Sequence, residues 1–216
     1  VASSGNNFLI KGAGKTATIF DGDAAANGLG ERFLSITTGA SFVTISDMTI
    51  QDMGGTGFAG NGAGINVTTS GSVTLQDLHF KNGDLASANN GGGLYLDGSS
   101  NTLVDRCTFS LNNEYTGGGN SDGSAIYVSN GTRTIQNCLF YDNASEGTYT
   151  GTIKMVAAST ITNVYNCTFT ENTGTGSSNT DGAIESEDGT LNVRNTIIYN
   201  NTLVHSIYER SGTASM

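Results

Sequence analysis

The chain has 216 residues, of which 31 are Gly and none is Pro or Trp. Charged residues make up only 13% of the sequence, and nineteen acidic against nine basic residues give a formal net charge of −10. We therefore expect neither nucleic acid nor an anionic membrane as a partner, because both repel an acidic protein. The Gly content disfavours helices, whereas a hydrophobic content of 36% suffices for a core.

The sequence contains no segment that is typical of a membrane-spanning helix. No stretch approaches the roughly 18 consecutive apolar residues of a membrane helix, and no charged-then-apolar leader opens the chain. We therefore expect no membrane insertion of this segment. Because Val1 opens the sequence and residues 211–216 continue its pattern, we expect a piece of a longer protein. Residues 1–216 are expected to form a single domain, less regular in 1–53 and regular in 54–208.

Short runs of alternating apolar and polar residues follow one another along the chain. Weak examples near the start are residues 8–11, 17–20, 33–36 and 42–45. From there on, each run ends on a large apolar residue every 29 to 31 positions: Ile50, Phe80, Phe109, Phe140, Phe169 and Ile198. Further runs that begin with small residues precede them, at 62–67, 91–96, 123–128, 151–156 and 182–186. Alternation with a period of two predicts β-strands with one buried face.

This period predicts a β-solenoid. A unit of about 30 residues that contains only strands and Gly- or Asn-rich turns cannot bury its apolar face alone, so successive units must stack in parallel. Parallel connections are right-handed in nearly all known cases. We therefore predict an all-β fold, a right-handed parallel β-helix of about seven turns with roughly 30 residues per turn.

Two further positions repeat with the same period. Two residues before the apolar column, Cys occurs at 107, 138 and 167. Stacked buried thiols, a disulfide between neighbouring turns, and a metal site are the alternatives for Cys107, Cys138 and Cys167. Three residues after the column lie Asn112, Asn143, Asn172 and Asn201. Asn tolerates the left-handed backbone of a sharp corner and can hydrogen-bond from turn to turn, so this column is interpreted as structural.

Taken together, these strand openings and the Phe-x-x-Asn corners resemble the repeats of the polymorphic outer-membrane, autotransporter-type adhesins. They are also similar to the secreted right-handed parallel β-helix proteins of the pectate-lyase-like superfamily. The resemblance extends from about Phe33 to Tyr208 and implies an extracellular or cell-surface location. It specifies activity poorly, because adhesins, lyases and hydrolases share this scaffold.

Enzymatic residues are sparse. Residues 179–182, Asn-Thr-Asp-Gly, match the first motif of the polygalacturonases, but the other motifs of that family do not follow. A lyase would need a base that abstracts a proton from a uronate. Arg106, Arg133, Lys154 and Arg194 are the basic residues of the regular turns between residues 91 and 201 and fall in no common column. We therefore predict no catalytic residues and no cofactor.

Calcium is the one ion that the sequence leaves open. Carboxylates close to turns suit a hard cation, because backbone carbonyls are also free there. The candidates are Asp21, Asp23, Asp181, Glu185, Glu187 and Asp188.

We expect a structural or adhesive protein that binds a glycan or a cell-surface protein without catalysis. The alternatives are a lyase or hydrolase that acts on an acidic polysaccharide in a sheet groove, and a filament subunit that associates end to end. Loops between the turns are expected to carry the binding residues, at residues 54–60, 84–90, 115–122 and 174–180.

Overall fold

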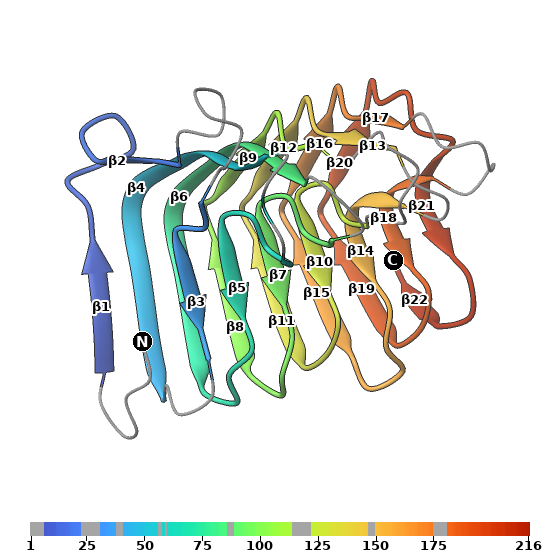
Figure 1. Ribbon diagram of the computed structural model, residues 1–216. Coiled ribbons are helices and arrows are strands. Elements are labelled where there is room, and N and C mark those ends of the chain that lie inside the picture. The colour runs from blue at the N-terminus through green and yellow to red at the C-terminus, as the bar shows by residue number, and fades with distance from the viewer. Residues whose placement is uncertain are drawn as a thin grey trace.

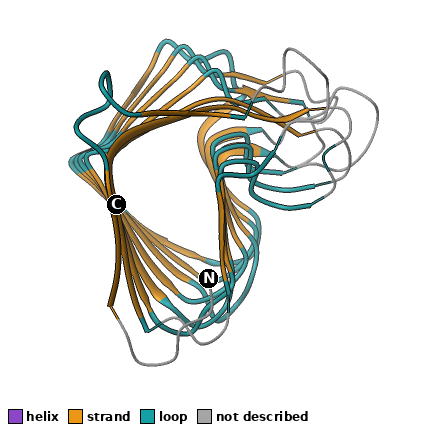
Figure 2. Ribbon diagram, turned by 60° about the vertical axis from the view of Figure 1, so that its left-hand side comes forward, coloured by secondary structure: helices purple, strands orange, loops and turns teal. Residues whose placement is uncertain are grey.

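In the computed structural model, the chain winds into a stack of parallel β-strands (Figure 1). The structure describes residues 7–22, 31–37, 41–55, 58, 60–85, 89–113, 122–146, 150–174 and 181–216. Within them every secondary-structure element is a strand, and each strand pairs in parallel with its counterpart one turn away. Successive turns superpose when the molecule is turned (Figure 2). The predicted fold is therefore confirmed as a parallel β-helix.

The described strands form two long sheets and one short sheet. One sheet has seven strands: β3 (Leu34–Ile36), β5 (Ile65–Val67), β7 (Leu94–Leu96), β10 (Ile126–Val128), β14 (Gly151–Met155), β18 (Gly182–Ser186) and β21 (His205–Glu209). The other long sheet has thirteen: β1 (Asn7–Lys11), β2 (Ile19–Asp21), β4 (Phe42–Gly55), β6 (Ser72–Leu85), β8 (Asn101–Asp105), β9 (Thr108–Ser110), β11 (Thr132–Gln136), β12 (Leu139–Tyr141), β15 (Ile161–Tyr165), β16 (Thr168–Thr170), β19 (Thr190–Arg194), β20 (Ile197–Tyr199) and β22 (Thr213–Ser215). The short sheet pairs β13 (Ala144–Ser145) with β17 (Thr173–Gly174).

The thirteen-stranded sheet bends, and left-handed residues make the bend. In the middle turns, two short strands replace the long strands β4 and β6, and a residue with φ near +50° lies between them. This first corner column consists of Asp47, Asp77, Arg106, Asn137, Asn166 and Asn195. A second corner column follows each strand of the Phe column: Asp52, Asn82, Leu111, Asp142, Glu171 and Asn200. The period of 29 to 31 residues is therefore also a period of backbone geometry.

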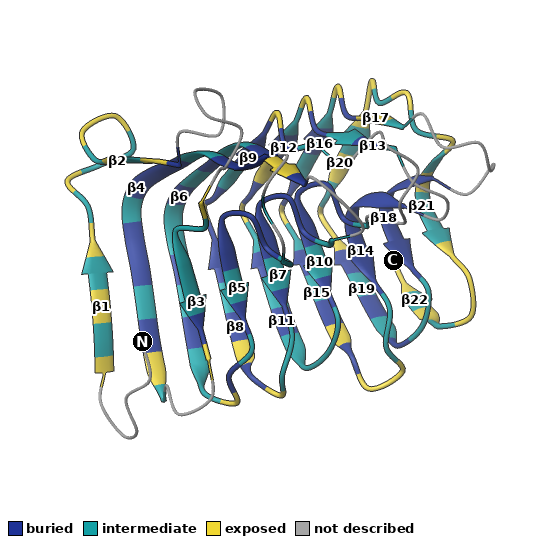
Figure 3. Ribbon diagram, in the orientation of Figure 1, coloured by how far each residue is buried: buried dark blue, intermediate teal, exposed yellow. Residues whose placement is uncertain are grey.

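About five turns are regular, at roughly 30 residues per turn. The sequence predicted about seven, because it counted the weaker patterns at both ends as whole turns. The strands β1 and β2 at one end, and β21 and β22 at the other, belong to incomplete turns and are more exposed than the middle of the stack (Figure 3).

The core contains columns in which the same side chain stacks from turn to turn. The rings of Phe80, Phe109, Phe140 and Phe169 lie 4.4 to 4.9 Å apart between centroids and are nearly parallel. Next to them, all three cysteines are buried free thiols. Each donates its S–H to the carbonyl oxygen two residues earlier, for example from Cys138 to Gln136 at 3.1 Å. Burial raises the pKa of the Cys138 thiol, which keeps it protonated.

The Asn column is a ladder of side-chain amides. The Nδ2 groups of Asn112, Asn143 and Asn172 each donate to the Oδ1 of the next Asn along the stack, at 2.9, 2.9 and 2.8 Å, and Asn201 accepts the last bond. The left-handed residue at this corner is the one before each Asn rather than the Asn itself. The sequence predicted the left-handed backbone at the Asn residues themselves, which is one position too late. Asn occupies these positions because its buried amide forms the ladder.

Candidate functional site

The seven-stranded sheet carries one outward-facing residue per strand, and we call this series the outward column. It runs through Ser35, Asn66, Tyr95, Tyr127, Lys154, Glu185 and Tyr208. In β7, the neighbours of Tyr95 are Leu94 and Leu96, both fully buried in the core. Because side chains alternate between the two faces of a strand, the middle residue points away from the core. Unlike the interior columns, this one changes its chemistry along the stack.

Two stacked tyrosines form the centre of the outward column. The rings of Tyr95 and Tyr127 lie 5.4 Å apart between centroids, with 6° between their planes. Both side chains are half-buried, and burial raises the pKa of both phenols. The hydroxyl groups therefore stay protonated at neutral pH and can donate hydrogen bonds. Tyr95 also hydrogen-bonds with the side chains of Ser129 and Asn61.

Next along the column lies a buried ion pair. Lys154 Nζ is 2.8 Å from Glu185 Oε1 and 3.7 Å from Glu187 Oε2, and the side chains of Lys154 and Glu185 are at most 2% exposed. Arg210 reaches Glu187 from the next turn, at 2.6 Å. Burial raises the pKa of Glu185 to about 7, against the lowering effect of the Lys154 ammonium group, and Asp122 and Glu187 add to the rise.

A short ladder of Asn and Asp side chains borders the column where the strands begin. Asn90 N donates to Asn61 Oδ1 at 2.9 Å, and Asp122 N donates to Asn90 Oδ1 at 3.0 Å. Each of these residues precedes a Gly with φ of +70 to +78°, which turns the chain into the strand. The sequence carries a signal for this ladder, which is an Asn or Asp directly before the repeated Gly.

This face has more hydrogen-bond acceptors than donors. Among the described residues, three buried acceptor atoms on it have no hydrogen-bond partner: Asn66 Oδ1, Asp122 Oδ1 and Glu185 Oε2. Burial also raises the pKa of Asp122. An unpaired buried acceptor costs free energy, and a donor from a ligand would recover that cost.

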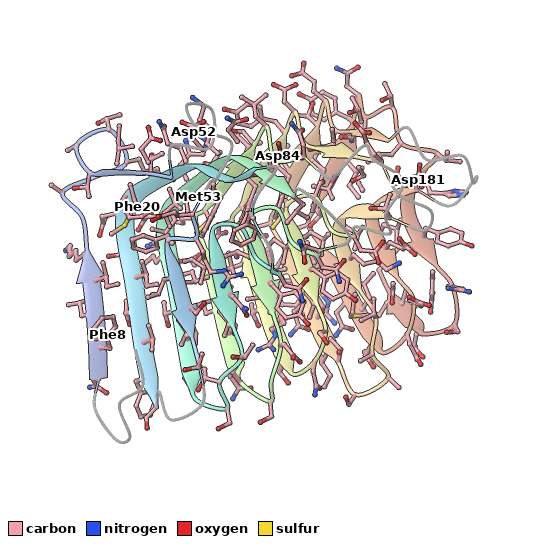
Figure 4. The ribbon with its side chains drawn as sticks, viewed as in Figure 1. Phe8, Phe20, Asp52, Met53, Asp84 and Asp181 are labelled. Atoms are coloured by element: carbon pink, nitrogen blue, oxygen red, sulfur yellow. The ribbon has the colours of Figure 1, made fainter. Side chains whose placement is uncertain are left out.

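The expected calcium ligands do not come together. Asp21 accepts a hydrogen bond from Gln51 at the exposed end of β2, and Asp23 lies outside the described residues. Asp188 Oδ1 accepts from Gly189 N within its own turn. Asp181 is buried at the start of β18, at the other end of the stack from Phe8 (Figure 4). Glu185 and Glu187 instead surround Lys154.

In the described part of the chain, no group of three or more His, Cys, Asp or Glu side chains could hold a metal ion. The described residues therefore do not form the calcium group that the sequence left open.

The four basic candidates of the sequence lie in different environments. Arg106 lies at an exposed corner and donates two hydrogen bonds to the carboxylate of Asp77, at 3.0 and 2.9 Å. Arg133 points into the core and is fully buried. Arg194 is exposed at the end of β19, so that only Lys154 of the four belongs to the outward column.

The predicted binding loops fall mostly on residues 56–57, 59, 86–88, 114–121 and 175–180, which lie outside the described residues. Of the first loop, Phe58 is described. Its ring lies 5.0 Å from the guanidinium carbon of Arg32, which also donates to the carbonyl oxygens of Asn61 and Gly62. Arg32 thus borders the ladder of Asn61 at the N-terminal end of the outward face.

Comparison with protein families identifies the architecture. A family model described as "right handed beta helix region" matches residues 34–214. No curated protein and no solved structure matches the chain. Among the described residues, no helix is long and apolar enough to cross a membrane.

Proposed function

Because the chain belongs to the right-handed β-helix family, we propose that it is a non-catalytic binding protein whose ligand is a glycan lying along the outward column. We also propose that it acts outside the cell, at a surface or after release, where polymers of this kind are met. The fold alone does not decide between binding and catalysis. The proposal therefore rests on the chemistry of this face.

The observation that carries the proposal is the stacked pair of Tyr95 and Tyr127 among polar acceptors. Tyr presents an apolar ring together with a hydroxyl group, which suits a ligand that is itself partly apolar and rich in hydroxyls. Residues of the column repeat at the strand spacing of about 4.8 Å. A linear polymer laid along the stack can therefore contact several turns at once.

The arrangement of the charged residues supports binding rather than turnover. The ammonium group of Lys154 is held by the carboxylates of Glu185 and Glu187, whereas a catalytic base must be free to take up a proton. Glu185 is fully buried, and its Oε1 accepts from Lys154. Because Lys154 and Glu185 are paired with each other, neither is a free base for proton transfer from a ligand.

One observation favours catalysis as a second candidate. A carboxyl group with a pKa of about 7, as burial gives Glu185, suits a general acid at neutral pH. A hydrolase or lyase that uses this face would release products, and Glu185→Gln would abolish their release.

The test of the proposal is affinity electrophoresis of the protein in gels that contain neutral, amino and acidic polysaccharides, with product analysis in parallel. We expect retardation without products, and we expect Tyr127→Ala to weaken binding at least tenfold. Tyr199→Ala is the matched control, because Tyr199 is 57% exposed on β20, in the other sheet. Equal losses in both variants, or no retardation in any gel, would contradict the proposal.

A further inference from the structure

The charges on the outward face select among glycans. We infer that the preferred ligand is a polymer of amino sugars, whose ammonium and hydroxyl groups donate hydrogen bonds, and that polyuronates are excluded. This inference rests on the proposed function and narrows it to a substrate class. It departs from the acidic polysaccharide that the sequence suggested for an enzyme.

Asp97 directly follows β7, the strand of Tyr95, Asp122 precedes β10, the strand of Tyr127, and Glu187 directly follows β18. Asp122, Glu187 and Asp97 all act electrostatically on the phenol of Tyr127, and each raises its pKa. Asp122 and Glu187 also act on Glu185 in the next turns. A cationic group of a ligand that lies over Tyr127 would therefore meet several negative charges at once.

The basic groups of the face are already engaged. Lys154 is bound to Glu185 and Glu187, and Arg210 to Glu187. Arg32 donates to backbone carbonyls and to Ser35, and packs against Phe58. A uronate carboxylate would thus have to break an existing ion pair to find a cation, at a cost that a neutral or cationic sugar does not incur.

The unpaired acceptors point in the same direction. Glu185 is fully buried, and within the part of the chain that the structure describes its Oε2 has no hydrogen-bond partner; the same holds for Asn66 Oδ1 and Asp122 Oδ1 on this face. The amide oxygen of Asn66 can only accept a hydrogen bond, and the carboxyl oxygens of Asp122 and Glu185 accept when their groups are ionised. Ammonium and hydroxyl groups satisfy such atoms, whereas a carboxylate of the ligand repels them. Two of the three unpaired acceptors belong to Asp122 and Glu185 of the acidic cluster, and together these groups favour a ligand rich in donors.

The experiment compares three polymers by isothermal titration calorimetry: glucosamine oligomers at a pH at which their amines are protonated, N-acetylglucosamine oligomers of the same length, and oligogalacturonate. We expect the amine oligomer to bind at least tenfold more tightly than the acetylated one, and oligogalacturonate not to bind. This advantage should shrink as salt is added, because screening weakens charge pairing at an exposed surface.

A matched pair of variants separates this site from the general negative charge of the protein. Asp122→Asn removes one charge but keeps the ladder, because Asn61 and Asn90 occupy the same position in the preceding turns. Asp142→Asn makes the same change at an exposed corner whose counterpart in a later turn, Asn200, is already Asn. We expect Asp122→Asn to weaken binding of the amine oligomer about threefold to tenfold, and Asp142→Asn to leave it unchanged.

The outcomes separate the two claims. Equal affinity for the amine and acetylated oligomers, abolished by Tyr127→Ala, would overturn this inference and leave the proposed function standing. Binding of oligogalacturonate, or equal effects of Asp122→Asn and Asp142→Asn, would likewise overturn the inference. Absence of binding to all three oligomers, and to every other polymer in the gels, would overturn both.

Discussion

The interior columns and the outward column obey opposite rules, although both follow the same period. Inside, the same side chain recurs in consecutive turns: Phe stacks on Phe, Cys lies next to Cys, and Asn bonds to Asn. Outside, the middle residue of the seven-stranded sheet changes at almost every turn, from Asn66 through two tyrosines to Lys154 and Glu185.

This contrast shows at which positions of the repeat the residue type can change from turn to turn. An amide inside the stack needs an amide above and below it to satisfy its donors and acceptors, and a Phe ring needs a partner of the same shape. The outward column has no such constraint. Its residues therefore need not match from one turn to the next, which leaves room for the proposed binding site.

The largest effect is expected where an interior ladder is broken in its middle. Asn143 is fully buried, accepts from both N and Nδ2 of Asn112, and donates to Phe109 O and Asn172 Oδ1. Asn143→Ala leaves several of these groups unpaired and should lower the free energy of unfolding by about 3 to 5 kcal/mol. Urea denaturation measures this loss.

The matched control is Asn201→Ala, at the less buried end of the same ladder. It should cost clearly less, because water can replace the missing groups there. Equal losses at both positions would mean that burial does not set the strength of the ladder.

Arg133 is an interior residue that departs from repetition, and it comes next in expected effect. Its guanidinium group donates to Thr102 Oγ1 at 2.9 Å and to the carbonyl oxygens of Asp97 and Gly98 at 3.0 Å. Burial lowers the pKa of Arg133 to about 10, so it remains charged at neutral pH. Thr162 pairs with Arg133 in the neighbouring strand, so Thr is a residue that this column already contains. Arg133→Thr nevertheless leaves a void and unpaired acceptors. We expect a loss of about 2 to 4 kcal/mol in thermal or urea unfolding.

A loss below about 0.5 kcal/mol would show that the Arg133 hydrogen bonds contribute no net stability, as happens when the desolvation of a buried charge offsets them. Thr162→Ser, a small change at the equivalent position in the next turn, provides the baseline.

Glu185, in the outward column, should make the stability of the protein depend on pH. Its pKa is raised from 4.5 to about 7 by burial, so the folded protein holds this proton more tightly than the unfolded chain does. The stabilisation from this group is complete below about pH 4.5 and is lost as the pH rises to about 7, amounting to about 3 kcal/mol at most. Lys154, Glu187 and Asp122 are the charged groups that act on it.

Glu185→Gln removes this titration and keeps the shape of the side chain. Urea unfolding at several pH values should give a wild-type curve that falls relative to the variant curve between pH 4.5 and 7. Parallel curves would mean that Glu185 titrates alike in the folded and unfolded protein.

The interior could be predicted from the sequence because it repeats. Phe109 and Phe140 mark the strands by their spacing alone, and Asn112 and Asn143 mark the ladder in the same way. The corner was placed one residue too late, because its left-handed positions accept residues as different as Leu111, Asp142 and Asn200 and so leave no column of one type.

The outward face could not be predicted in this way. Charged residues are rarely fully buried, so the sequence did not indicate that Arg133, on the inner face with Ile135, and Lys154, on the outer face between Ile153 and Met155, would both be covered. The pairing of Lys154 with Glu185 joins residues 31 positions apart. It depends on the exact length of the intervening turn, which only the structure fixes.

The smallest effect is a gain in stability at a corner. Leu111 has φ near +57° and is 42% exposed. A left-handed backbone costs most residues about 1 to 2 kcal/mol, and Asn considerably less. Leu111→Asn should therefore raise the free energy of unfolding by about 0.5 to 1 kcal/mol, since Asn200 already occupies the same corner in a later turn.

Leu139→Asn makes the same change at a Leu that is 37% exposed and lies in β12. Asn is disfavoured in strands, so this control should lose stability. Opposite signs for the two substitutions would show that the backbone of the corner, rather than the side chain, governs position 111. A loss of stability in both variants would mean that the apolar contacts of Leu111 matter more than its backbone conformation. Side-chain packing would then govern the corner, as it governs the interior.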